Sequence, residues 1–259
     1  MSTTVTEKPP LELLPKPSVA VHETAVAAAE WFEKSREARR RAGDVVGLAN
    51  ASHNLGEAWS DQGRLEDAEG LLREARRIWR ASKYTMGAAA ASSGLGRTLG
   101  RLGSTDAGLA LLAEATATFD DLGIAPWTRE SIARQADVLT LGGRFEEALE
   151  LAQRWLPEFP SDEAATAILR RVEGIALRAA GAADAARHAL LDSLARAAEA
   201  GSDYEIALTT AELGRLPERD PDLRAGDTER AREIADRLGV DLARVMSSVP
   251  WDMAPQSVT

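Results

Sequence analysis

Cysteine is absent from the 259-residue chain, and aromatic residues make up only 5% of it. The absence of cysteine excludes disulfides, thiolate metal sites, iron–sulfur clusters and cysteine nucleophiles. The scarcity of aromatic side chains argues against a β-sandwich or a β-barrel. No stretch approaches 18 uncharged apolar residues, so we expect no segment that spans a membrane.

Basic residues are also in the minority, with 31 Lys and Arg against 41 Asp and Glu and a net charge of −10. A surface that binds nucleic acid or anionic lipid needs an excess of clustered Lys and Arg, so we expect neither partner. Arginines cluster at 36–41 and at 73–80, and one interpretation is a patch that binds phosphate groups. Glu37 and Glu74 within the clusters favour the other interpretation, in which both are solvated helix faces with internal ion pairs. The first residues carry no basic start followed by an apolar run, so we expect a cytoplasmic protein.

A small residue recurs in a similar apolar frame at steps of 40, 40, 38 and 40 residues. The recurring pairs are Leu55-Gly56, Leu95-Gly96, Gln135-Ala136, Glu173-Gly174 and Leu213-Gly214. A second series of glycines keeps the same register at Gly63, Gly103, Gly143 and Gly181. Between about 64 and 81, apolar residues fall at the three- and four-residue steps of an amphipathic helix. Each unit is therefore predicted to be two helices joined at a glycine turn, with the first small residue allowing close helix packing.

These units resemble the tetratricopeptide repeat (TPR), whose helices carry the patterns W-x2-L-G-x2-Y and A-x3-F. In the clearest unit the slots hold Leu55, Gly56, Trp59, Ala68 and Leu72, while the first tryptophan slot holds Ser52. The step of about 40 residues exceeds the usual 34, so longer helices are expected. Residues 24–240 are also similar to the C-terminal repeat region of bacterial class III adenylate and guanylate cyclases and of ATPase-repeat regulators. The resemblance implies an all-α, right-handed, TPR-like superhelical solenoid.

The repeat frame divides the chain into a disordered or extended tail at 1–21, a repeat domain at 22–240 and a second tail at 241–259. Within the repeat domain we expect an unpaired helix at 22–42. Five helix pairs should follow at about 44–81, 83–121, 125–158, 161–199 and 202–239.

The unpaired first helix raises the question of what covers it, because four prolines between 9 and 17 prevent a preceding partner helix. An uncovered end of a repeat array exposes apolar surface. Three alternatives remain open. The chain is a piece of a longer array, or the leucines at 11, 13 and 14 fold back over the end, or Trp31 and Phe32 form a homodimer contact.

No residue pattern predicts catalysis. His22, His53 and His188 lie in different units, and Glu57 one helical turn after His53 completes only half of a metal site. The glycines between 94 and 100 have the spacing GxGxxxG inside a helical pattern, unlike a dinucleotide-binding loop. Phosphate-binding loops and nucleophile elbows are absent from the sequence. We therefore expect no enzyme, no metal and no cofactor.

By resemblance to the repeat family, the first helix of each pair lines a concave groove that takes an extended peptide or a helix. The groove candidates are Asn50, His53, Asn54, Glu57, Ser93, Arg97, Arg101, Glu130, Arg134, Asp137, Arg171, Arg178 and Arg215. Asn50 and Asn54 lie one turn apart on one helix face, where they either bond a peptide backbone or bond the neighbouring unit. The arginines at the later positions suggest a carboxylate-bearing ligand.

The sequence therefore predicts a protein–protein interaction scaffold or adaptor in bacterial signalling, which binds a peptide or a partner domain in its groove. The alternative is a sensor or regulatory module of a nucleotide cyclase or a transcriptional regulator, separated from its effector domain. An enzyme on a helical scaffold is a third class, for which the sequence supplies no motif.

Overall fold

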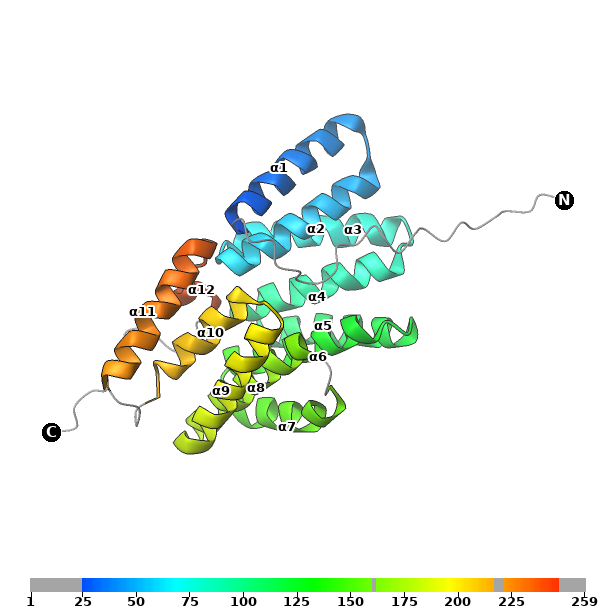
Figure 1. The fold of residues 1–259 in the computed structure, drawn as a ribbon. Coiled ribbons are helices and arrows are strands. Elements are labelled where there is room, and N and C mark those ends of the chain that lie inside the picture. Colours follow the sequence, from blue (N-terminus) through cyan, green and yellow to red (C-terminus); the bar gives the residue numbers. More distant parts are fainter. Residues whose placement is uncertain (1–24, 160–161, 217–220, 247–259) are drawn as a thin grey trace.

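The computed structural model describes residues 25–159, 162–216 and 221–246, and every regular element within them is helical (Figure 1). The helices are α1 (Ala25–Ala42), α2 (Val45–Gln62), α3 (Leu65–Ala81), α4 (Thr85–Arg101), α5 (Thr105–Asp121), α6 (Ala125–Leu141), α7 (Phe145–Trp155), α8 (Glu163–Ala179), α9 (Ala183–Glu199), α10 (Asp203–Leu213), α11 (Pro221–Leu238) and α12 (Leu242–Val245). A short 3-10 turn, η2 (Leu156–Glu158), follows α7. Helices that follow one another in sequence pack against each other, so the predicted all-α solenoid is confirmed.

The turns between helices repeat every 20 residues, twice as often as the sequence pattern revealed. Positive φ angles occur at 43, 63, 83, 103, 123 and 143, and then at 181, 201 and 239. Gly63 shows the reason: its N–H donates to Ser60 over 3.2 Å and the N–H of Arg64 donates to Trp59 over 2.8 Å, which closes α2 in a left-handed cap. Lys83, with φ of 58°, is the one non-glycine residue in this conformation among the described residues.

The small residues of the repeat frame have the packing role that was predicted. A Cβ atom added to Gly56 would lie 2.7 Å from Cγ of Leu72 on α3, and one added to Gly174 would lie 2.6 Å from Cγ of Leu190 on α9. Between α4 and α5 the backbones themselves approach, since a Cβ on Gly108 would lie 2.6 Å from the carbonyl oxygen of Gly96. Glycine is therefore required where α2, α4 and α8 meet their partner helices.

Helix α1 packs against α2 and leaves one aromatic side chain uncovered. Phe32 packs on the buried cluster of Ala29, Leu55 and Leu71, whereas the Trp31 side chain is 63% exposed. The arginines of α1 pair with acidic neighbours, as expected for a solvated face: Arg36 contacts Glu74, and Arg40 and Arg41 contact Glu37. Both predicted tails, except residues 241–246, lie outside the described residues, as do the leucines and prolines before residue 18.

The last helical turn returns to the second helix of the chain. Residues 241–246, which we assigned to the C-terminal tail, form α12 and its flanks. The N–H of Asp241 donates to the Gln62 carbonyl over 3.2 Å, and Arg244 pairs with Glu66 at 2.7 Å. We call these contacts of 62–66 with 241–244 the clasp; they close the solenoid on itself (Figure 1). None of the described helices combines the length and apolarity needed to cross a membrane.

Candidate functional site

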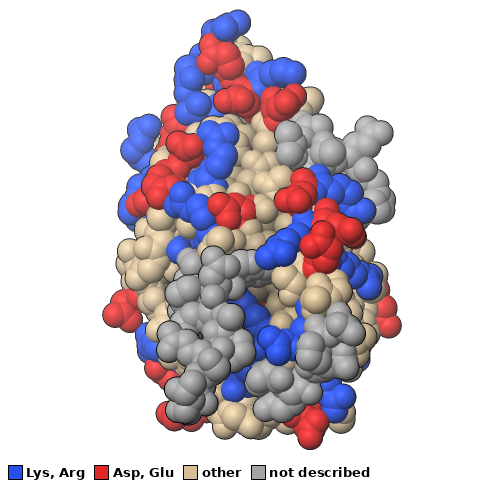
Figure 2. Space-filling model, turned by 90° about the vertical axis from the view of Figure 1, so that its left-hand side faces the viewer, with Lys and Arg blue, Asp and Glu red and all other residues tan. Residues whose placement is uncertain are grey.

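A cavity of about 520 Å³ lies inside the closed solenoid, lined by the first helices of successive pairs. Its walls come from α2, α4, α6, α8 and α10, including the turns that precede α8 and α10. Figure 2 shows one face of the molecule with a hollow in which Lys or Arg side chains are visible. Because five helices from distant parts of the sequence contribute side chains, the cavity exists only in the folded array.

The structure brings most of the predicted groove residues together around this cavity. The residues that line it are His53, Asn54, Glu57, Ser93, Arg97, Arg101, Glu130, Arg134, Asp137 and Arg171. Asn50, one turn before Asn54, is half-buried and does not line the cavity. Arg178 and Arg215 line a separate pocket of about 20 Å³ between α6, α8, α10 and α12.

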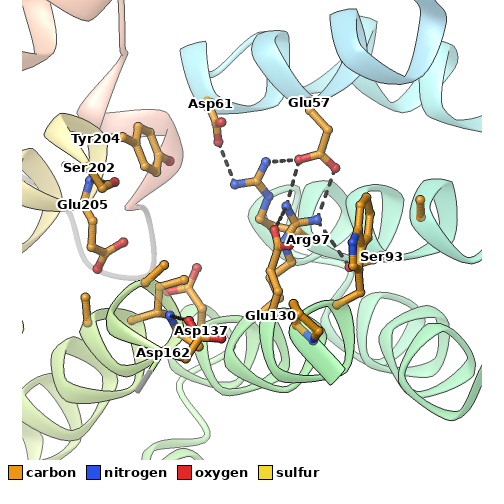
Figure 3. A pocket seen from close by; sticks show the side chains of 18 of the residues that line it. Glu57, Asp61, Ser93, Arg97, Glu130, Asp137, Asp162, Ser202, Tyr204 and Glu205 are labelled. Atoms are coloured by element: carbon orange, nitrogen blue, oxygen red, sulfur yellow. Dashed lines mark hydrogen bonds and ion pairs between the residues drawn. The ribbon is translucent and has the colours of Figure 1, made fainter. Parts of the chain in front are cut away.

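Glu57 is the centre of the first charged cluster in the cavity. Its carboxylate accepts hydrogen bonds from Arg97 on α4 at 2.5 Å and from Arg134 on α6 at 3.0 Å (Figure 3). Arg97 also pairs with Asp61 at 2.7 Å, and Arg134 pairs with Glu130 at 2.6 Å. Burial by itself would raise the pKa of Glu57, but attraction to Arg134 and Arg97 outweighs it and holds the pKa well below its usual range. Glu57 is therefore an anion that ties three first helices together.

Arg171 on α8 is the centre of a second charged cluster. It donates to Asp137 on α6 over 2.9 Å and to both oxygens of Glu205 on α10. The three side chains are between 6% and 11% exposed, so this cluster is more deeply buried than the first. A single guanidinium here faces two carboxylates.

Arg101 and Tyr204 join the two clusters across the cavity. Nη2 of Arg101 donates to the Tyr204 hydroxyl over 2.6 Å, although the residues are 103 positions apart. Burial raises the pKa of the Tyr204 hydroxyl, so that it stays protonated and can donate a hydrogen bond. Sequence reasoning missed Tyr204 and Glu205, because α10 starts well before its Leu213-Gly214 marker. It also missed Asp61, which the four-residue step from Glu57 would have revealed.

Several polar groups at the cavity have no protein partner. Nδ1 of His53, and Nε of both Arg97 and Arg101, are buried without a hydrogen-bond partner among the described residues. Burial lowers the pKa of His53, which keeps this imidazole neutral near neutral pH. The amide of Asn54 also makes no hydrogen bond within the described part of the chain. Buried polar groups usually have partners. Of the groups named here, the Asn54 amide belongs to a half-buried side chain in the lining, so it can meet a ligand.

Part of the cavity lining is apolar. Ala90, Pro126, Trp127 and Ile168 contribute this apolar surface from the amino-terminal halves of α4, α6 and α8. Each carboxylate of the lining is engaged by an arginine. No group of three His, Asp or Glu side chains in the described ranges could hold a metal ion. Most of the residues that line the cavity are nevertheless polar or charged.

Comparisons with known proteins show the fold of this chain but no family. No protein-family model matches the sequence, and no curated protein does. Among solved structures, the chain is similar to the Rap conjugation gene regulator of the plasmid pLS20 in complex with the Phr* peptide, with a TM-score of 0.56 and 17% identity over 83% of this chain and 70% of that one. It also aligns with BtubC from P. vanneervenii, with a TM-score of 0.48 and 19% identity over 88% and 92% of the two chains. The chain is thus a TPR-like helical-repeat protein.

Proposed function

We propose that this protein is a peptide-binding regulatory adaptor whose ligand occupies the central cavity. The observation that carries the proposal is the gathering of His53, Asn54 and the charged groove residues around one cavity. Asn54 can donate to and accept from a peptide backbone, and its amide is free to do so. The structurally similar Rap regulator, on the same type of fold, was solved with a peptide bound.

The size of the cavity favours a short peptide over a partner domain. A volume of about 520 Å³ lies within the range of small-ligand sites. The arginines that led us to expect a carboxylate-bearing ligand already hold carboxylates of the groove itself. A ligand carboxylate would have to displace Glu57, Asp137 or Glu205.

The cellular role follows from the sequence resemblance to repeat regions of bacterial regulators. In this role the protein senses a peptide in the bacterial cytoplasm and passes the signal to an effector, either as a separate adaptor or as a regulatory module. The exposed Trp31 on α1 is the proposed contact for the effector or for a second copy of the chain. Catalysis has no part in this proposal, because each acid of the cavity is held in an ion pair.

The test is binding of pooled synthetic peptides of about four residues, a length that suits a cavity of this size. The peptides are N-acetylated and C-amidated, and their binding is measured by native mass spectrometry. Asn54→Ala should weaken binding about five- to tenfold, because one or two hydrogen bonds are lost. Asn50→Ala is the matched control, since Asn50 lies on the same helix outside the cavity. Binding that both variants leave unchanged, or no binding by any pool, would contradict the proposal.

A further inference from the structure

One edge of the groove is uncharged in every unit. The second residues of the first helices, from α2 to α10, are Val46, Met86, Pro126, Ala164 and Tyr204. Hydrogen bonds between neighbouring first helices join residues 38 positions apart, so these helices keep the register of the repeat and the five residues follow one edge. Pro126 and Ala164 line the cavity and are also exposed to solvent, so they lie at its opening.

Two larger apolar side chains continue from this opening into the cavity. Trp127 follows Pro126 on α6, and Ile168 lies one turn after Ala164 on α8. Both line the cavity and are only half-buried, so each offers apolar surface to a ligand. The Trp127 ring is held from behind by Phe119, whose ring centre lies 5.4 Å away. We call Pro126, Trp127, Ala164 and Ile168 the apolar rim.

The polar side chains beside the apolar rim already have partners in the chain. Asp162, before α8, pairs with Arg129 at 2.8 Å. Glu130, one turn after Pro126, pairs with Arg134 at 2.6 Å. Ser202 accepts a hydrogen bond from the first turn of α10. A polar ligand group that lost its water here would gain little in return, whereas an apolar group would gain from leaving water.

We propose that the peptide bound in this cavity carries one bulky apolar side chain, which packs on Trp127 and Ile168 at the apolar rim. The inference rests on the proposed function and adds the class of ligand: a peptide selected by an apolar residue as well as held by its backbone. The apolar rim and Asn54 line the same cavity, so one peptide can contact both.

The experiment compares pairs of tetrapeptide pools that carry either Leu or Asn, two side chains of similar shape and different polarity. The fixed residue occupies each of the four positions in turn, the other positions hold Gly, Ala or Ser, and both ends are blocked. Binding to the full chain is measured by equilibrium dialysis. At one position or more, the Leu pool should bind about 10- to 100-fold more tightly than the Asn pool, because the Leu side chain leaves water at the rim.

The variant that tests the apolar rim is Ala164→Asp, with Ala185→Asp as its matched control. Both alanines are exposed in the first turn of a helix, where a carboxylate is favourable, so both variants should keep the Tm of the parent. Ala164 lines the cavity, and Ala185, on α9, does not. Ala164→Asp should lower the preference for Leu over Asn about fivefold or more, because Leu would have to desolvate the new carboxylate. Ala185→Asp should leave the preference unchanged.

Ile168→Ser tests the rim without adding a charge. It removes part of the apolar surface and should also lower the preference for Leu over Asn. The measured quantity is the ratio of two affinities in one variant, so a smaller folded fraction lowers both affinities equally and does not change it.

Three results would overturn the inference. Equal binding of the Leu and Asn pools at all four positions would leave the peptide site standing and remove the apolar selection. A preference for Leu that Ala164→Asp and Ile168→Ser leave intact would place the apolar contact elsewhere. Binding by none of the pools would remove the proposed function and this inference together.

Discussion

Arg134 on α6 reaches Glu57 on α2, 77 residues earlier, and donates to its carboxylate over 3.0 Å. Arg97 on the intervening α4 holds the same carboxylate. Because alternate first helices meet through side chains, the concave surface is curved tightly enough to become an enclosed cavity. The link from Arg101 to Tyr204 and the clasp close the same surface from the other side.

Replacing Glu57 by Gln should destabilise the protein by about 3 kcal/mol at pH 7, because it leaves two largely buried guanidiniums with fewer anions. The pKa of Glu57 is depressed in the folded state, so its contribution is fully present above an unfolded-state pKa of about 4.3 and is lost as pH falls below it. The stability difference between parent and Glu57→Gln should therefore shrink between pH 5 and pH 3. Urea unfolding at several pH values measures it; a constant difference would contradict the assignment.

Gly108→Ala and Gly70→Ala should change stability in opposite directions. An added Cβ at Gly108 meets the backbone of Gly96 at 2.6 Å, so α4 and α5 must separate, at about 1–3 kcal/mol. Gly70 is exposed in the middle of α3 with nothing within 4 Å, so alanine should stabilise it by about 0.5–1 kcal/mol. Thermal unfolding of the two variants compares them directly. A gain in Tm for Gly108→Ala would show that the helices are packed less closely than described.

Lys83→Gly should stabilise the turn between α3 and α4. Lys83 has φ of 58° at a position where the other turns of this type hold glycine. A Cβ atom in that conformation is unfavourable by about 1–2 kcal/mol, part of which glycine loses again to backbone entropy. We expect a net gain of about 0.5–1 kcal/mol. Lys83→Ala is the control, because it keeps the Cβ atom and should not stabilise the protein.

Opening of the solenoid should be visible as a distance change across the clasp. Since the chain has no cysteine, Gly70→Cys on α3 and Ala243→Cys on α12, both exposed, accept spin labels at those sites alone. Arg244→Glu places a second negative charge beside Glu66, and high salt screens the native ion pair. Either change should lengthen and broaden the distribution of distances between the two spin labels.

Arg187→Glu on α9 is the matched control for Arg244→Glu, because the two arginine side chains have similar exposure, 45% for Arg187 and 43% for Arg244. It should leave the distances unchanged. Distances that Arg244→Glu also leaves unchanged would mean that the closed form does not need the ion pair and that the backbone contact of Asp241 with Gln62 is enough to hold it.

The sequence by itself determined the all-α solenoid and the repeating close contacts between paired helices. Gly56, Gly96 and Gly174 mark where a first helix meets its partner, and the resemblance to the repeat family suggested that His53, Glu57 and Arg97 face the groove. These features depend on local conformation and on contacts between neighbouring helices, which a repeating pattern records.

Only the tertiary structure decided what the groove residues contact. The pairing of Arg171 with both Asp137 and Glu205, the link from Arg101 to Tyr204 and the docking of α12 on Gln62 join residues 34 to about 180 positions apart. The curvature that brings them together is the sum of small rotations between successive units. Each rotation is set by side-chain packing at one interface, so a small difference per unit decides between an open groove and a closed cavity.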